Sequence, residues 1–255
     1  VHSGRADAAG TGKGYMMKTP VRLIGTLVLL VVASFSWSAA KNDWPMETFE
    51  PDLTDLPSLQ SGFKLYANYC LGCHGLQYQR YGRTADDLGI PRELALESVV
   101  FTGQKIGELI TTSMDAEQAK GWFGAAPPDL TLEARLRSPE WIYNYLKTFY
   151  VDESRPLGVN NGVYPNVGMP NVLLPLQGVQ RYDADTKQLS LEAGTGALTA
   201  EEFDQAIYDL TNFLYYVGEP NRLQRQRLGV YVLLFLVILG TFTYLLNREF
   251  WKDVH

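Results

Sequence analysis

The chain has 255 residues, of which 28 are acidic and 22 basic, giving a formal net charge of −6 at pH 7. This balance weighs against a nucleic-acid-binding protein, because phosphate recognition depends on clustered Lys and Arg. The chain has only two cysteines and three histidines, so a disulfide-rich fold is excluded. The length allows one large domain or two small ones.

The first 40 residues predict a leader and a signal peptide. Lys18 and Arg22 precede an apolar run over residues 23–35, and small residues follow. A basic region, an apolar region too short to cross a membrane easily and a small-residue site are typical of secretory signals. We expect cleavage near Ala39 or Ala40 and export of the domain that follows. A retained N-terminal anchor is the alternative.

The exported domain is expected to open with an extended lead-in, because three prolines are spread over residues 45–57. Ser58 or Ser61 then fits the N-cap of a helix that runs through Tyr69. Apolar and aromatic residues recur along one face of this segment at helical spacing. The predicted helix would deliver the motif that follows it.

Residues 70–74, Cys-Leu-Gly-Cys-His, form the attachment motif of a c-type haem. Two thiols at this spacing reach the two vinyl groups of one porphyrin, and the next side chain reaches the iron. A redox dithiol would not need His74. A structural zinc site would need further ligands, but the chain has no other Cys, and its other histidines, His2 and His255, lie at the extreme ends. We therefore predict one covalent haem c held by Cys70 and Cys73, with His74 as an iron ligand.

Residues 84–118 predict mostly helical structure with a break at Pro91. Beyond them, Pro127 and Pro128 indicate a rigid loop with no backbone donor at either position. Carbonyl groups in such a loop are suited to orient a haem-ligating imidazole, which usually donates its second ring N–H to an acceptor. An ordinary linker loop is the alternative.

Ser138 and Pro139 predict the start of another helix. Trp141, Tyr145 and Phe149 recur along it at four-residue steps. Such a stripe is by itself more often part of a core than a cofactor contact.

Met169 is the favoured second iron ligand. The domain contains no second histidine, and methionine is the usual alternative in cytochromes c. Met46 and Met114 are the other candidates. Met169 lies between Gly and Pro within an irregular stretch over residues 151–181, where glycine permits close approach and proline fixes the chain. Long irregular loops in compact domains are usually functional or disordered.

The C-terminal part predicts a hairpin, a capped helix and a membrane anchor. The hairpin falls at residues 181–191, and Thr199 with Glu202 forms a capping-box pattern for a helix ended by Gly218. Residues 228–246 carry no charge. A helix of this length rises about 28 Å, close to the bilayer core of about 30 Å.

The sequence therefore divides into a leader and signal (1–40), a haem domain (41–221) and a transmembrane anchor with a short tail (222–255). Basic residues flank both ends of the apolar run, so they do not set its orientation. The signal instead predicts a periplasmic haem domain and a cytoplasmic C-terminus, in a single-pass protein of the bacterial inner membrane. Residues 41–227 hold 25 acidic and 16 basic residues, a net charge of −9. That charge suits docking of a basic partner, and plain solubility explains it equally well.

In this order, these features resemble the cytochrome c1 family of proteobacterial type, the haem subunits of ubiquinol–cytochrome c oxidoreductase (bc1) complexes. The resemblance covers about residues 41–252. It rests on Tyr-x-x-Cys-x-x-Cys-His, Pro-Pro-Asp-Leu at 127–130, Gly-Met-Pro at 168–170 and the C-terminal anchor. It implies a mostly α fold: a class I cytochrome c-like haem domain with long loops, plus one transmembrane helix. Some relatives have a disulfide for which this chain lacks the cysteines.

The resemblance also implies roles for individual residues. His74 and Met169 would be the axial ligands, and the Pro128 carbonyl would orient His74. Arg137 would lie near a haem propionate, although it would otherwise be taken for a solvated surface charge. Trp141 falls where relatives carry an aromatic residue near the haem, once a small gap is allowed.

The implied function is one-electron transfer from the Rieske iron–sulfur protein to a soluble or membrane-bound cytochrome c. Further implied partners are cytochrome b, membrane lipid and a second copy in a dimeric complex, with no nucleic acid. The isolated chain would be an electron carrier, and the enzyme would be the complex, with quinol chemistry in cytochrome b. The alternatives are a membrane-anchored cytochrome c serving a terminal oxidase, nitric oxide reductase or dehydrogenase, and a haem-based sensor or peroxidase-like enzyme.

Overall fold

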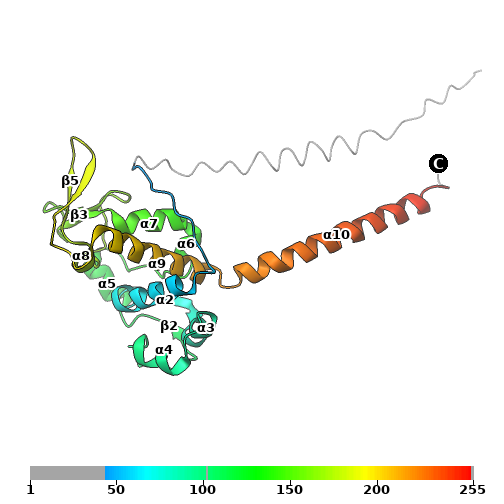
Figure 1. The fold of residues 1–255 in the computed structure, drawn as a ribbon, viewed down its shortest axis with the longest axis horizontal. Helices are drawn as coiled ribbons and strands as arrows, with labels where there is room; N and C mark the ends of the chain where they lie inside the picture. Colours follow the sequence, from blue (N-terminus) through cyan, green and yellow to red (C-terminus); the bar gives the residue numbers. More distant parts are fainter. Residues whose placement is uncertain (1–43, 102, 254–255) are drawn as a thin grey trace, which may run out of the picture. The chain divides into compact units, whose positions relative to one another are not determined.

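The computed structural model describes residues 44–253, apart from residue 102 (Figure 1). The leader and signal peptide expected at residues 1–40 lie outside the described residues. The helical elements are α2 (Leu56–Leu65), the π-helix η1 (Tyr66–Cys70), α3 (Tyr81–Asp87), α4 (Arg92–Ser98), α5 (Ala116–Phe123), α6 (Glu133–Leu136), α7 (Pro139–Lys147), α8 (Leu174–Gln177), α9 (Ala200–Gly218) and α10 (Arg222–Phe250). Antiparallel pairs join β1 (Leu76–Arg80) to β2 (Leu109–Ile110), β3 (Phe149–Val151) to β4 (Val159–Asn161), and β5 (Gln180–Asp183) to β6 (Gln188–Leu191). The mostly α prediction is confirmed.

Helices α2 and α9 pack closely at the centre of the core, and α7 packs on α9 (Figure 1). Gly62 on α2 lies against the α9 backbone, where an added Cβ would sit 2.1 Å from the Asp209 carbonyl oxygen. Beside this contact, the buried rings of Phe63 and Phe213 stack with their centroids 5.1 Å apart. The missing Cβ of glycine therefore sets how closely the two helices approach.

The helix that leads to the Cys-x-x-Cys-His motif begins earlier than predicted. Asp55, rather than Ser58 or Ser61, is the N-cap of α2, and its side chain accepts the Ser58 N–H at 3.1 Å. Pro57 lies in the first turn, where its missing N–H costs no helical hydrogen bond. Ser58 is instead buried, and its hydroxyl accepts a hydrogen bond from Asn212 on α9 at 3.3 Å. The side chain of Ser58, which the local pattern predicted as the N-cap, therefore contributes to the packing between α2 and α9 instead.

The prediction of mostly helical structure over residues 84–118 is only partly correct. The break at Pro91 is confirmed, since α3 ends at Asp87 and α4 begins after the proline. Between α4 and α5, however, the described chain forms turns and the short strand β2. Here the Gly82 N–H donates to the Ile106 carbonyl at 2.6 Å. Pairing with a segment far away in sequence has replaced local helical bonds.

Helix α7 begins as predicted but ends sooner than its aromatic stripe. The Ser138 hydroxyl accepts the Trp141 N–H at 3.2 Å, and Pro139 lies in the first turn. Tyr145 continues the stripe on α7, whereas Phe149 already lies in β3. The stripe nevertheless holds together in space, because the rings of Tyr145 and Phe149 meet edge to face at 5.1 Å.

The predicted hairpin and the capping box of α9 are confirmed. The hairpin is β5–β6. The Thr199 hydroxyl accepts the Glu202 N–H at 3.2 Å, and the Glu202 carboxylate accepts the Thr199 N–H at 2.9 Å. Gly218 is the last residue of α9 rather than its C-cap, which is Glu219. An added Cβ on Gly218 would lie 3.1 Å from the Arg135 side chain, so this glycine serves packing against α6.

The extended lead-in is confirmed and lies against α7 and α9. Asn144 exchanges two hydrogen bonds of 2.8 Å with the backbone of Glu47. The ring of Phe49 lies near those of Tyr143 and Tyr208, with centroids 5.3 and 5.1 Å away. These contacts fix the segment without regular secondary structure.

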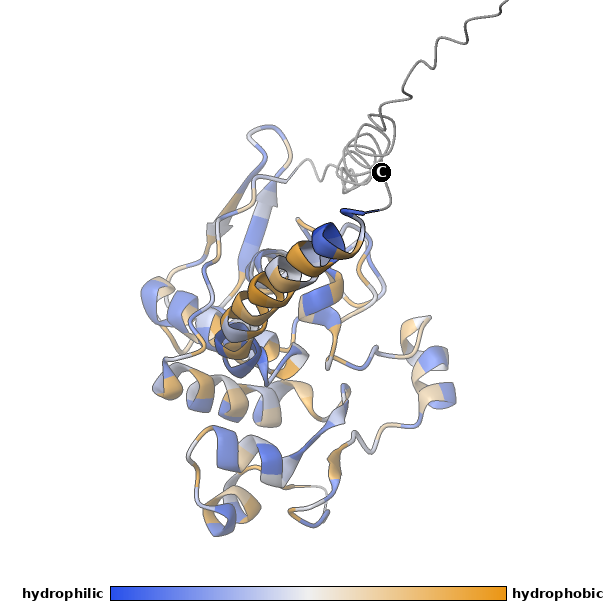
Figure 2. Ribbon diagram, turned by 90° about the vertical axis from the view of Figure 1, so that its right-hand side faces the viewer, coloured by the Kyte–Doolittle hydropathy of each residue, from blue (hydrophilic) through white to orange (hydrophobic). Residues whose placement is uncertain are grey.

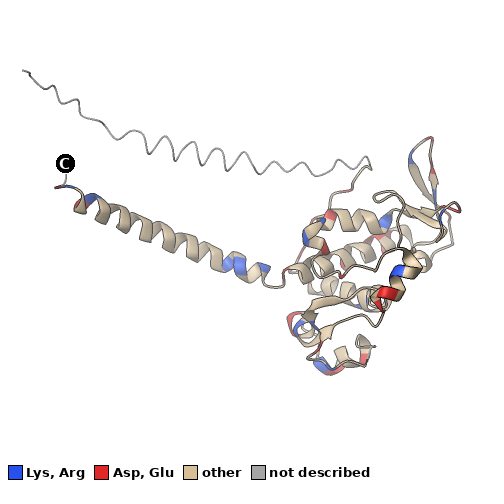
Figure 3. Ribbon diagram, turned by 180° about the vertical axis from the view of Figure 1, so that it is seen from behind, with Lys and Arg blue, Asp and Glu red and all other residues tan. Residues whose placement is uncertain are grey.

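Helix α10 is long and apolar enough to cross a membrane. It contains the expected span of residues 228–246 and extends it at both ends. Figure 2 shows that most of this helix is coloured as hydrophobic, and Figure 3 shows Lys and Arg near its ends. At the start of α10, Glu219 forms ion pairs with Arg222, at 3.8 Å, and with Arg225. These pairs connect the helix to the end of α9.

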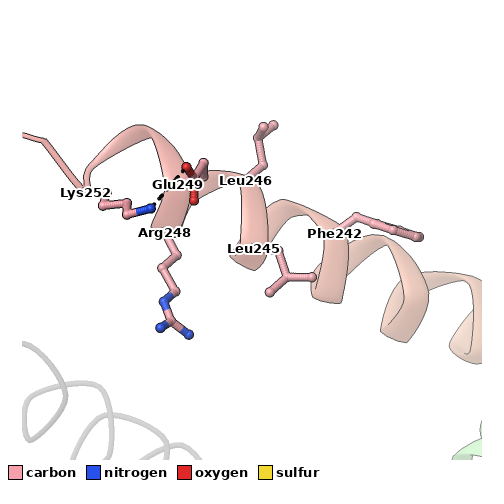
Figure 4. Close-up of a pocket in the computed structure, with 6 residues that line it drawn as sticks. All are labelled: Phe242, Leu245, Leu246, Arg248, Glu249 and Lys252. Atoms are coloured by element: carbon pink, nitrogen blue, oxygen red, sulfur yellow. Dashed lines mark ion pairs between the residues drawn. The ribbon is translucent and has the colours of Figure 1, made fainter.

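The far end of α10 changes from apolar to charged within two turns (Figure 4). Phe242 and Leu246 come before Arg248, and Lys252 forms an ion pair with Glu249 at 3.6 Å. The length of the apolar stretch therefore matches a membrane span with polar residues at each boundary.

Candidate haem-binding site

The Cys-x-x-Cys-His motif forms a tight turn at the end of η1. The N–H groups of Cys73 and His74 both donate to the Cys70 carbonyl, at 3.0 and 2.8 Å. The two thiols and the imidazole are thereby held within one turn. Cys70 is buried and Cys73 is half-buried. Burial, together with the neighbouring Cys73, raises the pKa of Cys70 to about 12. Burial also raises the pKa of Cys73, so the protonated thiol is favoured at both residues.

The imidazole of His74 is held by the double-proline loop. Its Nδ1 lies 2.7 Å from the Pro128 carbonyl oxygen, so the ring donates Nδ1–H there and leaves Nε2 to bind a metal. Burial lowers the pKa of His74, although the Pro128 carbonyl and the carboxylates of Glu133 and Asp129 act in the opposite direction. The neutral imidazole that results is the form that ligates iron.

Asp129 fixes the loop that carries this carbonyl. Its carboxylate accepts the Gln77 N–H at 2.7 Å, and also the N–H and hydroxyl of Thr131 at 3.0 and 2.5 Å. The Leu130 N–H donates to the Gly75 carbonyl at 2.9 Å, directly beyond His74. Sequence reasoning gave Asp129 no role of its own. The signal for one was its position two residues before Thr131, a spacing typical of an Asp side chain that bonds its own turn.

Arg137, the C-cap of α6, lies beside Trp141 in the first turn of α7. The guanidinium of Arg137 lies over the indole of Trp141, 4.5 Å from the ring centroid, and forms an ion pair with Glu133 at 3.1 Å. The ring of Tyr145 also stacks on the indole, with centroids 4.8 Å apart and an interplanar angle of 11°. The Arg137 side chain is 41% exposed, so its charge faces the domain surface.

Met169 contacts the stacked side chains of Arg137, Trp141 and Tyr145 through the Tyr145 hydroxyl, which donates to the Met169 Sδ at 3.4 Å. The loop is close-packed beside the methionine, since an added Cβ on Gly168 would lie 3.0 Å from the Phe123 carbonyl oxygen. Met169 itself is half-buried. The structure thus brings Arg137, Trp141 and Met169 together in one contact series, and it brings His74 and Pro128 together in another. Tyr145, which connects the first series, was given no role by sequence reasoning.

The donor set fits an iron porphyrin better than an isolated metal ion. Over residues 44–253 without residue 102, no three His, Cys, Asp or Glu side chains come together in a metal-binding group. A zinc site would need such a cluster. An imidazole held through Nδ1 and a thioether on a separate loop are instead a ligand pair of cytochromes c. The Cys-x-x-Cys-His turn also has space beside Gly72, where an added Cβ would meet no atom within 4 Å.

The comparisons with known proteins agree with this geometry. A sequence model of the Cytochrome C1 family matches residues 44–254. The chain is 47% identical to a protein named cytochrome c1 from Allochromatium vinosum, an alignment that covers 89% of this chain and 96% of that protein. It is 39% identical to a protein of Nitrosomonas europaea named ammonia monooxygenase gamma subunit, with 92% and 100% covered. It is 29% identical to cytochrome c1 of Rhodospirillum rubrum, with 78% and 83% covered. The match spans the motif turn, the double-proline loop and α10, and the chain belongs to the cytochrome c1 family.

Proposed function

We propose that this chain passes single electrons from a Rieske iron–sulfur protein to a cytochrome c, as a subunit of a bc1 complex. Membership of the cytochrome c1 family gives the chain an electron-transfer role and one covalently bound haem c. The observation that carries the finer proposal is the hydrogen bond between His74 and the Pro128 carbonyl, because it prepares one imidazole nitrogen for an iron ligand.

Within this proposal, Cys70 and Cys73 would hold the haem through thioether bonds, and His74 and Met169 would ligate its iron. The bound haem supplies the chemistry, which is reversible uptake of one electron at iron. The residues around it set its potential and keep the ligands in place. Methionine ligation, a buried imidazole and an apolar surrounding all favour a high potential.

Arg137 and Trp141 are proposed to hold the propionate side of the haem. The guanidinium of Arg137 is partly exposed and lies over the Trp141 ring, and its several N–H donors suit binding of a carboxylate. The positive charge of Arg137 would then be shared between the carboxylate of Glu133 and the propionate. Tyr164 is half-exposed, and its ring centroid lies 5.7 Å from the same guanidinium, so Arg137 contacts both aromatic rings.

Family membership supports the remaining proposed partners, and the predicted signal and the anchor support the proposed location. We propose a haem domain at residues 41–221 in the periplasm and an anchor at residues 222–255 with its tail in the cytoplasm. The start of α10 at Arg222 supports this boundary. Cytochrome b and the Rieske protein, a dimeric complex, and membrane lipid around α10 belong to the same proposal. The net charge of −9 over residues 41–227 suits a basic electron acceptor.

A pull-down of the tagged full chain from its native membranes in mild detergent tests the proposal. The expected reduced-minus-oxidised spectrum contains b-type haem with the c-type haem, and paramagnetic resonance shows a Rieske cluster. Quinol should reduce the c-type haem in an inhibitor-sensitive way. Isolation of c-type haem alone, or with an oxidase, nitric oxide reductase or dehydrogenase, would refute the bc1 assignment and favour a generic membrane-anchored cytochrome.

A further inference from the structure

The indole of Trp44 lies against the backbone of Gly162, far away in the sequence. An added Cβ on Gly162 would lie 2.8 Å from three carbon atoms of the six-membered ring of Trp44, so a larger residue at position 162 would leave no room for the indole here. The Tyr182 ring on β5 is a second neighbour, with its centroid 6.0 Å from that of the indole. Trp44 is half-buried. The start of the extended lead-in therefore contacts a loop in the second half of the haem domain.

Gly162 is the first residue of the loop that carries Met169, which we call the ligand loop (residues 162–170). Three backbone N–H groups at the start of this loop donate to residues that precede it. These bonds run from Gly162 to the Thr148 carbonyl at 3.0 Å, and from Val163 and Tyr164 to the side chain of Asn161 at 3.0 and 2.9 Å. The start of the ligand loop is therefore held by hydrogen bonds, and the Trp44 ring packs directly on it.

The lead-in reaches Gly162 along a path that α7 and α9 determine. We call residues 44–52 the strap. Side chains of the two helices bind its backbone: Asn144 exchanges two hydrogen bonds of 2.8 Å with Glu47, the Tyr208 hydroxyl donates to the Glu50 carbonyl at 3.1 Å, and Asn212 donates to the Asp52 carbonyl at 2.7 Å. Because these bonds satisfy backbone groups, the strap is ordered without regular secondary structure. It connects the ligand loop with the core of the domain.

A ligand on a loop needs support from the residues packed beside that loop. A thioether is uncharged and a weak electron-pair donor, so it stays on a metal only while its loop keeps the sulfur at bonding distance. Loops hold such a geometry less precisely than helices and strands do, unless neighbouring side chains fix them. Trp44 supplies such a contact at the start of the ligand loop. Without the indole, Gly162 would lose this packing partner, and the ligand loop could move away from the haem.

We infer that Trp44 is a positioning residue for the haem, which holds the ligand loop closed through its contact with Gly162 and thereby keeps Met169 on the iron. The inference rests on the proposed ligation by Met169. Release of the strap should open the sixth coordination site, while the proposed thioether bonds keep the haem attached. The segment at the start of the haem domain then acts on the redox site and not on stability alone.

The test compares substitutions in the full chain, purified in detergent with its covalent haem. Trp44→Ala removes the indole, Trp44→Phe keeps an aromatic ring, and Gly162→Ala places a Cβ where the indole lies. Trp251→Ala and Gly107→Ala are the matched controls, because Trp251 is exposed beyond α10 and an added Cβ on Gly107 would meet no atom within 4 Å. The readouts are the sulfur-to-iron charge-transfer band of the oxidised haem and the fraction of reduced haem that binds carbon monoxide, which needs an open sixth site.

Trp44→Ala and Gly162→Ala should each weaken the band and raise carbon monoxide binding several-fold, at a temperature where circular dichroism shows an intact fold. Trp44→Phe should lie between Trp44→Ala and the wild type, and both controls should match the wild type. Because the two substitutions break the same contact, the double variant should be no worse than the stronger single variant. Effects that add in the double variant would show two separate causes and overturn the inference, as would a Trp44→Ala protein with unchanged band and carbon monoxide binding.

Met169→Ala separates this inference from the proposed function. If Met169→Ala keeps the charge-transfer band and the low-spin spectrum, the ligation proposal fails and the inference fails with it. If Met169→Ala abolishes the band while Trp44→Ala changes neither readout, the ligand is correct and only the role of Trp44 is refuted.

Discussion

The Nδ1 atom of His74 lies 2.7 Å from the carbonyl oxygen of Pro128, although the two residues are 54 positions apart in the chain. The acceptor is a backbone group, so its usefulness depends on the rigidity of the loop and not on a side chain. Pro127 and Pro128 limit two φ angles, and the hydrogen bonds of Asp129 fix the segment that follows. The following substitutions test separate parts of this arrangement.

Replacing both prolines with glycine should raise the midpoint potential of the haem. A mobile loop weakens the hydrogen bond to His74, and the imidazole then becomes a poorer donor to ferric iron. Redox titration of the full chain measures the change. Pro128→Ala is the control, because it keeps both the carbonyl and the preceding proline, and its potential should stay near that of the wild type. Equal potentials in all three proteins would show that loop rigidity does not act on His74.

Met169→Ala should convert the haem from low spin to high spin and lower its potential, because no other described side chain is proposed as the sixth ligand. Met114→Ala and Met46→Ala are the controls and should leave the spectrum unchanged. Absorption and magnetic circular dichroism of the oxidised proteins distinguish the two spin states. A spin change in Met114→Ala, with none in Met169→Ala, would move the ligand to residue 114.

Gly62→Ala should destabilise the haem domain by about 3 kcal/mol or more, because the new Cβ meets the backbone of α9 and overpacks the core. The clash of 2.1 Å with the Asp209 carbonyl leaves no flexible side chain to move aside. Gly121→Ala is the control, since an added Cβ there meets no atom within 4 Å. Thermal unfolding in detergent, followed by circular dichroism, should show a large loss for the first variant only. Similar melting of both variants would contradict the close approach of α2 and α9.

Asp204→Asn should lower the stability by about 1 kcal/mol at neutral pH, because Asp204 accepts hydrogen bonds from Lys147 and Tyr143 at 2.5 Å each. Burial alone would raise the pKa of Asp204, but these bonds outweigh it and hold the pKa below the ordinary value of 3.8. The stabilisation is therefore present above that value and disappears as the pH falls through the folded-state pKa.

Unfolding titrations at several pH values check this prediction. The difference between wild type and Asp204→Asn should shrink as the solution is made more acidic than the ordinary Asp pKa. The exposed hairpin residue Asp185 provides the control variant Asp185→Asn, which should match the wild type throughout. A difference that stays constant into strong acid would mean that the carboxylate charge is not what stabilises the cluster.

Sequence alone determined the features whose physical cause is local. The Cys-x-x-Cys-His turn, the caps at Ser138 and Thr199 and the uncharged run at residues 228–246 each depend on neighbours within one or two helical turns. Backbone hydrogen bonding and side-chain hydropathy act over that distance, so the pattern of residues is enough. The prediction of one covalent haem c rested on such a local motif for this reason.

Only the tertiary structure decided how distant segments meet. It placed the Pro128 carbonyl at His74, as the family resemblance had implied, and the Tyr145 hydroxyl at Met169, where the sequence pattern had indicated no role for Tyr145. In the structure, Ser58 bonds to Asn212 rather than capping α2. The segment before α5, which was expected to be helical, contains the strand β2, which pairs with β1. These outcomes depend on burial and on hydrogen bonds between segments far apart in the chain, and such interactions outweigh local propensities of a few tenths of a kcal/mol per residue.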